Sequence, residues 1–272
     1  AVTHVIRGDD HLNNAFRQLV IIRSMGWPEP AYGHVPLIHG HDGAKLSKRH
    51  GALGVDAYRD EMGVLPEALF NYLLRLGWGH GDDEIISREQ AVEWFDIAHV
   101  GKSPSRFDLA KLLNLNAHYL READDTHLAA LVAEKLTGDV DLALLTQAMP
   151  VLKVRAKDVN ELAASAAFLF AQRPLAMEEK ALALLTDDAR SLLGQIHARI
   201  ADAEWSLEAL EASLKAMAEE LGLGLGKLAQ PLRAALTGQT TSPGIFDVLV
   251  LLGREESLAR IGAQASAEAG KV

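Results

Sequence analysis

The chain has 272 residues, of which 49% are apolar and 6% aromatic, and it carries a net charge of −10. This composition is ordinary for a globular protein, and the length suffices for two or more domains. The absence of cysteine excludes a disulfide scaffold and a cysteine-ligated zinc site, and it fits a cytoplasmic protein. No apolar run approaches the ~20 residues that cross a bilayer, so we expect no membrane partner.

The beginning of the chain has the pattern of a strand, a tight turn and a helix. Residues 2–6 (VTHVI) predict a short buried strand, and apolar residues recur with a helical period over residues 12–25. Asp9 or Asp10 is the expected N-cap of this helix, and Gly26 is its expected end. Such a unit is typical of an open α/β sheet.

Arg7 follows the first expected strand directly. In open α/β sheets, ligands bind beyond the carboxyl ends of the strands, which makes Arg7 a candidate binding residue; an ordinary surface arginine is the alternative. A second extended run covers residues 34–38, where Pro36 confines it to an edge or to a strand end.

A dense basic loop comes next, at residues 45–49 (KLSKR), just after the Asp42-Gly43 pair. Asp-Gly predicts a tight turn, because glycine accepts positive φ at no steric cost. Three cations and a hydroxyl in five residues suit a polyphosphate, whose charge must be neutralised during bond rearrangement. A solvated basic turn is the alternative.

From residue 55 onward the pattern is helical, with Pro66 in a first turn and Ser87 and Gln90 spaced as a capping box. Residues 103–105 predict a turn. The expected helices cover residues 56–62, 65–77, 88–95, 108–113, a short stretch around 119–120, and 126–136, 141–149, 158–171, 178–185, 187–202, 206–221, 227–236 and 244–260.

These elements predict a mainly α protein with a short α/β region at its start. A polar break at residues 121–126 indicates a domain boundary. We expect three domains, at residues 1–54, 55–126 and 127–272, the last with two subdomains that divide near residue 187.

Cations and hydroxyls in the second half form candidate RNA contacts, although each group also fits an ordinary solvated surface. Lys153, Arg155 and Lys157 alternate at the start of an expected helix. Lys227 begins another expected helix, which also holds Arg233, and Thr240 lies in a hydroxyl-rich loop.

Several other site types are not supported. The closely spaced His34, His39, His41 and His50 lack helical i, i+4 spacing and a completing carboxylate pattern, so we expect no metal site. The sequence holds neither a G-x-x-x-x-G-K-[ST] loop nor a G-x-G-x-x-G turn after a strand.

Three stretches of the chain share one family resemblance. Residues 3–12 (THVIRGDDHL), residues 45–51 (KLSKRHG) and residues 226–233 (GKLAQPLR) occur in this order, with LPEAL and LGW motifs between the last two. They resemble the strand–turn–helix segment, the KMSKS signature and the end of the anticodon-binding region of class I glutamyl-tRNA synthetases. The likeness spans nearly the whole chain.

This resemblance implies an enzyme that activates glutamate with ATP and Mg²⁺ and then esterifies tRNA. It also implies the C-terminal part of a Rossmann-type catalytic domain, a stem-contact helical domain and an all-α anticodon-binding domain in a monomer. By the same resemblance, Lys48 stabilises the charge that builds on the phosphates, Lys45 assists it, and Ser47 shapes the loop.

The resemblance implies binding roles as well. Asp10, Leu46 and Lys48 would contact the nucleotide, and Arg7 would pair with a substrate carboxylate, where its planar fork fits better than lysine. Arg49 and the candidates of the second half would contact tRNA.

The family's HIGH signature and acceptor-end domain lie before the segment that opens this chain, and neither occurs here. We therefore expect a fragment that does not form glutamyl-adenylate alone. Three alternatives stay open: a synthetase that also charges tRNA for glutamine, a non-catalytic tRNA-binding module, and a helical scaffold with no RNA role.

Overall fold

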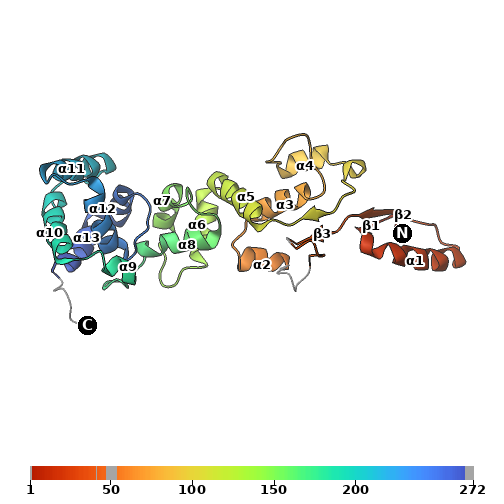
Figure 1. The fold of residues 1–272 in the computed structure, drawn as a ribbon, viewed down its shortest axis with the longest axis horizontal. Coiled ribbons are helices and arrows are strands. Elements are labelled where there is room, and N and C mark those ends of the chain that lie inside the picture. The colour runs from red at the N-terminus through yellow and green to blue at the C-terminus, as the bar shows by residue number, and fades with distance from the viewer. Residues whose placement is uncertain (1, 41, 47–53, 267–272) are drawn as a thin grey trace. The chain divides into compact units, whose positions relative to one another are not determined.

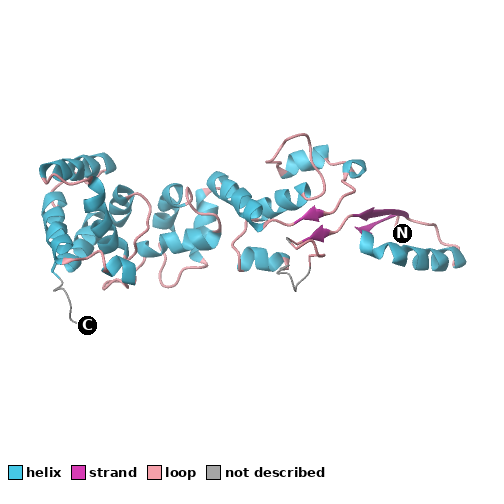
Figure 2. Cartoon of the chain, viewed as in Figure 1, coloured by secondary structure: helices cyan, strands magenta, loops and turns pink. Residues whose placement is uncertain are grey.

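The computed structural model describes residues 2–40, 42–46 and 54–266. The chain divides into two compact units, Ala1–Glu122 and Ala123–Val272. Helices dominate both units, and the short strands lie in the first, as the sequence predicts (Figures 1 and 2). The finer division into three domains remains a prediction. No helix in the described part of the chain is long and apolar enough to cross a membrane.

The first unit begins with two parallel strands joined by a helix. Strand β1 (His4–Gly8) pairs with β2 (Ala31–Val35), and α1 (Leu12–Ser24) connects them. The register places Arg7 opposite His34. The predicted strand and helix are confirmed, although β1 begins two residues later than expected. The predicted burial of the strand is wrong, because none of its residues is buried and Ile6 is 54% exposed.

The predicted cap of α1 is wrong. Asp9–His11 forms a short 3-10 turn, and His11 holds the N-cap position of α1 without a side-chain bond to the helix backbone; its ring Nδ1 lies 3.1 Å from the side-chain Nδ2 of Asn14 instead. The Asp10 carboxylate turns instead to the Lys45 ammonium. A full positive charge competes for this carboxylate more strongly than the neutral amides at a helix start.

A second pair of parallel strands was not foreseen. Strand β3 (Ile38–His39) pairs with β4 (Ser105–Arg106), and the Phe107 N–H donates to the His39 carbonyl at 2.8 Å. Ser105 thus begins a strand rather than ending the predicted turn. The single extended run predicted at residues 34–38 is wrong: β2 ends at Val35 and β3 begins at Ile38, in a different sheet. Pro36 lies between them, as a residue without an N–H should.

The helical part of the first unit begins at its predicted signals. Pro66 is the first residue of its helix, and Ser87 and Gln90 exchange both capping-box hydrogen bonds, at 3.1 and 2.9 Å. These confirm two predicted helix starts. The elements are α2 (Val55–Asp60), α3 (Pro66–Arg75), α4 (Arg88–Trp94), the short 3-10 turn η3 (Ile97–His99) and α5 (Leu109–Glu122).

Helix α5 is continuous, whereas the sequence predicted two short pieces. Its polar interior residue Asn116 is fully buried, accepts from the Leu65 N–H at 2.8 Å and donates to the Gly63 carbonyl at 3.4 Å. Because these bonds satisfy the buried amide, asparagine does not break the helix here.

The second unit is entirely helical in its described part. Most extents differ from the predicted ones by up to three residues, but the helix predicted at 158–171 ends at Ala166 and the one predicted at 244–260 continues to Ser266. The elements are α6 (Asp125–Ala133), α7 (Leu142–Leu152), α8 (Val159–Ala166), the 3-10 turn η4 (Ala167–Leu169), α9 (Glu179–Leu182), α10 (Asp187–Ile200), α11 (Leu207–Glu220), α12 (Leu225–Thr237) and α13 (Ile245–Ser266), the last broken at Gly253.

A buried arginine ties together three segments of the second unit. Arg260 of α13 is 2% exposed and donates to the carbonyls of Phe168 at 2.9 Å, Leu236 at 2.7 Å and Ala171 at 2.9 Å. Its Nε donates to Glu256 at 2.6 Å. The arginine thus joins the end of η4 to the end of α12.

Candidate functional site

A tight turn leads into the basic loop. Gly43 has φ +79°, a left-handed conformation that glycine adopts without strain, and the Gly40 N–H donates to the Ala44 carbonyl at 2.9 Å. The Leu46 N–H donates to the Ile38 carbonyl at 2.9 Å. The predicted Asp-Gly turn is therefore confirmed, and it is hydrogen-bonded to β3.

The turn brings Lys45 to the end of β1. The Lys45 ammonium forms an ion pair and hydrogen bond with the Asp10 carboxylate, from the 3-10 turn that follows β1. This hydrogen bond is the main cause that lowers the pKa of Asp10 below the usual range of an aspartate. Two residues that the sequence singled out separately thus lie together.

Arg7 lies in β1 among side chains from α1 and β2. Its Nη1 donates to Gln18 at 3.1 Å, its Nε donates to His34 at 3.5 Å, and its guanidinium lies 5.6 Å from the centre of the Tyr32 ring. Its Nη2 is buried and has no hydrogen-bond partner among the residues described. Arg7 is therefore held in place and retains an unsatisfied donor.

Ser47, Lys48 and Arg49 lie outside the described residues. Leu46 is half-buried, and its backbone continues the pairing with β3. The described candidates are therefore Asp10, Lys45 and Leu46 at the loop and Arg7 in β1.

The Asp10–Lys45 pair should be visible in a pH titration. Because the pKa of Asp10 is lowered in the folded chain, the pair stabilises the fold above the ordinary pKa of aspartate. That stability is lost as the pH falls through the lowered value. In a carboxyl ¹³C NMR titration, we expect Asp10 to titrate below an unpaired aspartate and Lys45→Met to raise its midpoint. A midpoint that does not move in Lys45→Met would contradict the pairing.

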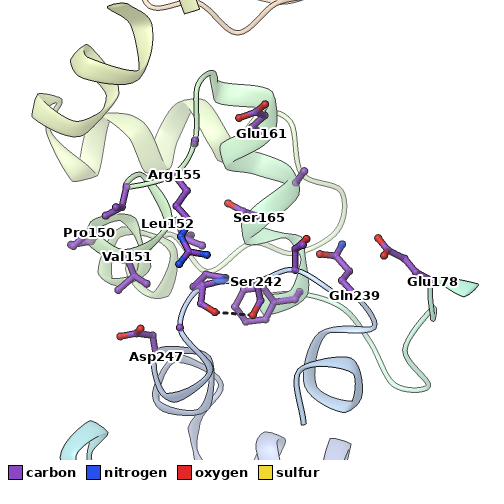
Figure 3. A pocket seen from close by; sticks show the side chains of 17 residues that line it. Pro150, Val151, Leu152, Arg155, Glu161, Ser165, Glu178, Gln239, Ser242 and Asp247 are labelled. Atoms are coloured by element: carbon purple, nitrogen blue, oxygen red, sulfur yellow. Dashed lines mark hydrogen bonds between the residues drawn. The ribbon is translucent and has the colours of Figure 1, made fainter. Parts of the chain in front are cut away.

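The second unit holds a pocket of about 780 Å³ between the end of α7, helix α8 and the loop from α12 to α13 (Figure 3). Arg155, Ser165 and Ser242 line it from these three segments, together with the apolar Phe168 and Pro243. The size and mixed lining are those of a small-molecule or nucleobase site. Three carboxylates, of Glu161, Glu178 and Asp247, also line the pocket.

Two predicted cations, Arg155 and Arg233, lie near each other at this pocket. The Arg233 Nε donates to the lining hydroxyl of Ser242 at 2.8 Å. Burial lowers the pKa of Arg233, and the positive charge of Arg155 lowers it further. The two guanidiniums therefore repel each other, which a bound anion or electron-rich group would relieve.

The other predicted RNA contacts do not line this pocket. Lys153 caps the end of α7 rather than starting a helix, and its ammonium pairs with Asp125 at 2.7 Å and donates to the Ala123 carbonyl at 2.9 Å. Its charge is thus paired within the unit, and its contact with tRNA remains a prediction. Lys157 precedes α8, Lys227 lies in the first turn of α12, and Thr240 lies in the loop that follows α12.

Two family models and the sequences of relatives cover the chain. The catalytic domain of class I tRNA synthetases (E and Q) matches residues 1–114, and the anticodon binding domain matches residues 109–265. Glutamate–tRNA ligase 2 of Novosphingobium aromaticivorans is 72% identical over 279 residues. The chain belongs to the glutamate–tRNA ligase family of class I aminoacyl-tRNA synthetases.

The chain spans little more than half the length of its glutamate–tRNA ligase relatives. The Novosphingobium match covers 97% of this chain and 57% of that protein. Glutamate–tRNA ligase 1 of Erythrobacter litoralis is also 72% identical, and that match covers 97% of this chain and 56% of the Erythrobacter protein. A crystal structure of a glutamate tRNA ligase from Elizabethkingia meningosepticum, in complex with its amino acid, matches with a TM-score of 0.81 at 28% identity, over 97% of this chain and 57% of that one.

Within this synthetase fold, several site residues were missed by the sequence analysis. Gln18, Tyr32 and His34 surround Arg7, and a period-2 reading of the second strand would have placed Tyr32 and His34 on one face. Ser165 and Phe168 had no signal, because their pocket forms only when α8 and α12 are folded. Across residues 2–40, 42–46 and 54–266, no group of three histidine, aspartate or glutamate side chains is arranged to hold a metal.

Proposed function

We propose that the full-length protein containing this chain joins glutamate to tRNA through a glutamyl-adenylate formed from ATP and Mg²⁺. In the first step, the glutamate carboxylate attacks the α-phosphorus of ATP and pyrophosphate leaves. Negative charge builds on the phosphates, so ammonium groups held beside them stabilise the transition state more than the ground state. The observation that carries this proposal is Lys45 of the KMSKS-like loop bound at the carboxyl end of β1.

Lys48 and Lys45 are the cations proposed for this step, with Ser47 shaping the loop between them. Leu46 and Asp10 flank the nucleotide. The ATP brings its Mg²⁺ as part of the substrate. The chain as given contains no HIGH signature, and we propose that it does not form glutamyl-adenylate without the remainder of the synthetase.

Arg7 is proposed to bind a carboxylate of the glutamate substrate. Its position is fixed by Gln18, His34 and Tyr32, and its Nη2 donor is unsatisfied among the described side chains. A carboxylate accepts two parallel bonds from a guanidinium, which a single ammonium does not reproduce.

Arg7→Lys should therefore weaken glutamate binding while keeping the charge. We expect the KM for glutamate to rise about tenfold in the full-length enzyme, because the two-bond contact is lost. Arg17→Lys, on the exposed part of α1, is the matched control. Steady-state ATP–pyrophosphate exchange kinetics with varied glutamate measure the change. An unaltered KM for glutamate in Arg7→Lys would contradict the assignment of Arg7 to the glutamate site.

The second unit is proposed to bind the anticodon through the pocket of Figure 3. Single-stranded bases are splayed out and read by stacking and by polar contacts at their edges. Phe168 is an apolar wall, Ser165, Gln239 and Ser242 offer polar atoms, and Arg155 supplies a charge. This mixture suits a base with its phosphate.

Arg155→Gln tests this pocket. Arg155 is exposed and lines the pocket, so its replacement should leave the fold intact and weaken tRNA binding about five- to tenfold, as the loss of one good base or phosphate contact does. Lys215→Gln, an exposed cation on α11, is the control for charge alone. Equal losses of tRNA affinity in the two variants at one salt concentration would show that Arg155 contributes only nonspecific electrostatic attraction, and would contradict a binding role for the pocket.

Charging of purified tRNA(Glu) and tRNA(Gln) by the full-length enzyme tests the whole proposal. We expect glutamate on tRNA(Glu); glutamate on both tRNAs would identify the non-discriminating form. Tight tRNA binding without any charging would instead support a non-catalytic tRNA-binding module.

A further inference from the structure

The carboxylate of Asp10 is directed across the chain to Lys45, and its Oδ2 also lies 4.0 Å from Nε2 of the neighbouring His11. Asp10 and Lys45 are 35 residues apart in sequence. Aspartate is a favoured helix cap, yet no side-chain capping bond to the described part of α1 is made from this turn. The carboxylate accepts from the Lys45 ammonium instead.

The backbone at the end of β1 leaves room for this orientation. A Cβ atom at Gly8 would lie 2.6 Å from Oδ1 of Asp10 and 3.1 Å from Cδ2 of Leu37. A side chain at this position would require Oδ1 of Asp10 to shift. The lack of a side chain at Gly8 thus leaves space for the carboxylate in the orientation that binds Lys45 through Oδ2.

Both partners stand on anchored backbone. Asp10 follows β1, which is paired with β2 along its whole length, and Lys45 forms a bridge with His39 of β3. The flexible part of the pair is thus the four-carbon stem of Lys45, whose side chain is 54% exposed. A free lysine of this exposure samples many rotamers, which must be ordered before its charge can act at one place.

We propose that Asp10 is a positioning residue that holds the Lys45 ammonium at the carboxyl end of β1 before ATP arrives. An ammonium has three N–H donors, so one binds Asp10 and two remain for phosphate oxygens. This inference rests on the proposed function, because Lys45 must act on a nucleotide for its orientation to matter. Asp10 would then affect the rate of adenylate formation by orienting Lys45 and not by contacting the reacting atoms.

A double-mutant cycle in the full-length synthetase separates this role from a direct nucleotide contact. We expect Asp10→Asn to lower kcat for ATP–pyrophosphate exchange about tenfold, because the Lys45 ammonium is no longer oriented. The KM for ATP should not rise, because the variant also removes a negative charge near the phosphates. Asp10→Glu should restore kcat to within about twofold, since it keeps the carboxylate. In a Lys45→Met background, Asp10→Asn should have no further effect.

The matched control is Asp9→Asn, which removes the same charge from the exposed preceding residue and should leave kcat unchanged. The proposal would be overturned if the double variant lost kcat by the product of the two single losses. It would also be overturned if Asp10→Asn raised the KM for ATP with a normal kcat, or if Asp10→Glu did not restore kcat. Absence of glutamate-dependent exchange in the unmodified enzyme would instead refute the proposed function. The NMR titration of Asp10 reports the pair itself without any activity.

Discussion

Replacing Lys48 by methionine in the full-length synthetase is expected to lower the rate of ATP–pyrophosphate exchange by about 10²–10³-fold. The charge on the phosphates increases as pyrophosphate leaves, so the missing ammonium affects the transition state more than bound ATP. We therefore expect kcat to carry most of the loss, with a smaller change in the KM for ATP.

Lys102→Met is the matched control, because it removes an exposed lysine of the first unit that lies outside the basic loop. It should retain normal kinetics. A loss confined to KM in Lys48→Met would mean that the loop binds ATP without acting on the reaction, and it would contradict the mechanism proposed above.

Replacing Arg260 by methionine should destabilise the second unit by about 3–5 kcal/mol, as the loss of a buried, fully bonded charge typically does. The variant would remove the donor to two buried carbonyl groups and to the half-buried carbonyl of Ala171, and would leave Glu256 with its other partner, Arg173, at 3.2 Å. Urea denaturation followed by circular dichroism measures the change as a lower midpoint for the unfolding of this unit.

The control for this substitution is Arg199→Met. Arg199 pairs with Glu220 at 2.9 Å on the exposed surface of the same unit, and such pairs contribute about 1 kcal/mol or less. Similar midpoints for both variants would show that the buried contacts of Arg260 contribute little to stability.

The helices of the second unit could be predicted because their signals are local. Leucine recurs with a helical period, and aspartate or hydroxyl side chains cap five of the starts. Thr186 and Ser206 each accept from the N–H three residues later, at 3.3 Å, at the beginnings of α10 and α11. The predicted starts at residues 187 and 206 therefore lie within one residue of the structure.

Other features depend on contacts that the sequence does not display. Strand β4 has only two residues and exists through its pairing with β3, more than sixty residues earlier. Lys153 resembled a free cation in the sequence, but Asp125 neutralises it in the folded unit. The Asp10–Lys45 pair also arises from the fold, although both residues were identified individually.

Glutamate-dependent ATP–pyrophosphate exchange by the full-length enzyme, in the presence of tRNA(Glu), tests the central claim most directly. We predict exchange with glutamate and not with aspartate or glutamine, and its near-complete loss in Lys48→Met. Exchange that is absent, that requires a different amino acid, or that persists undiminished in Lys48→Met would contradict the assignment of the basic loop to adenylate formation.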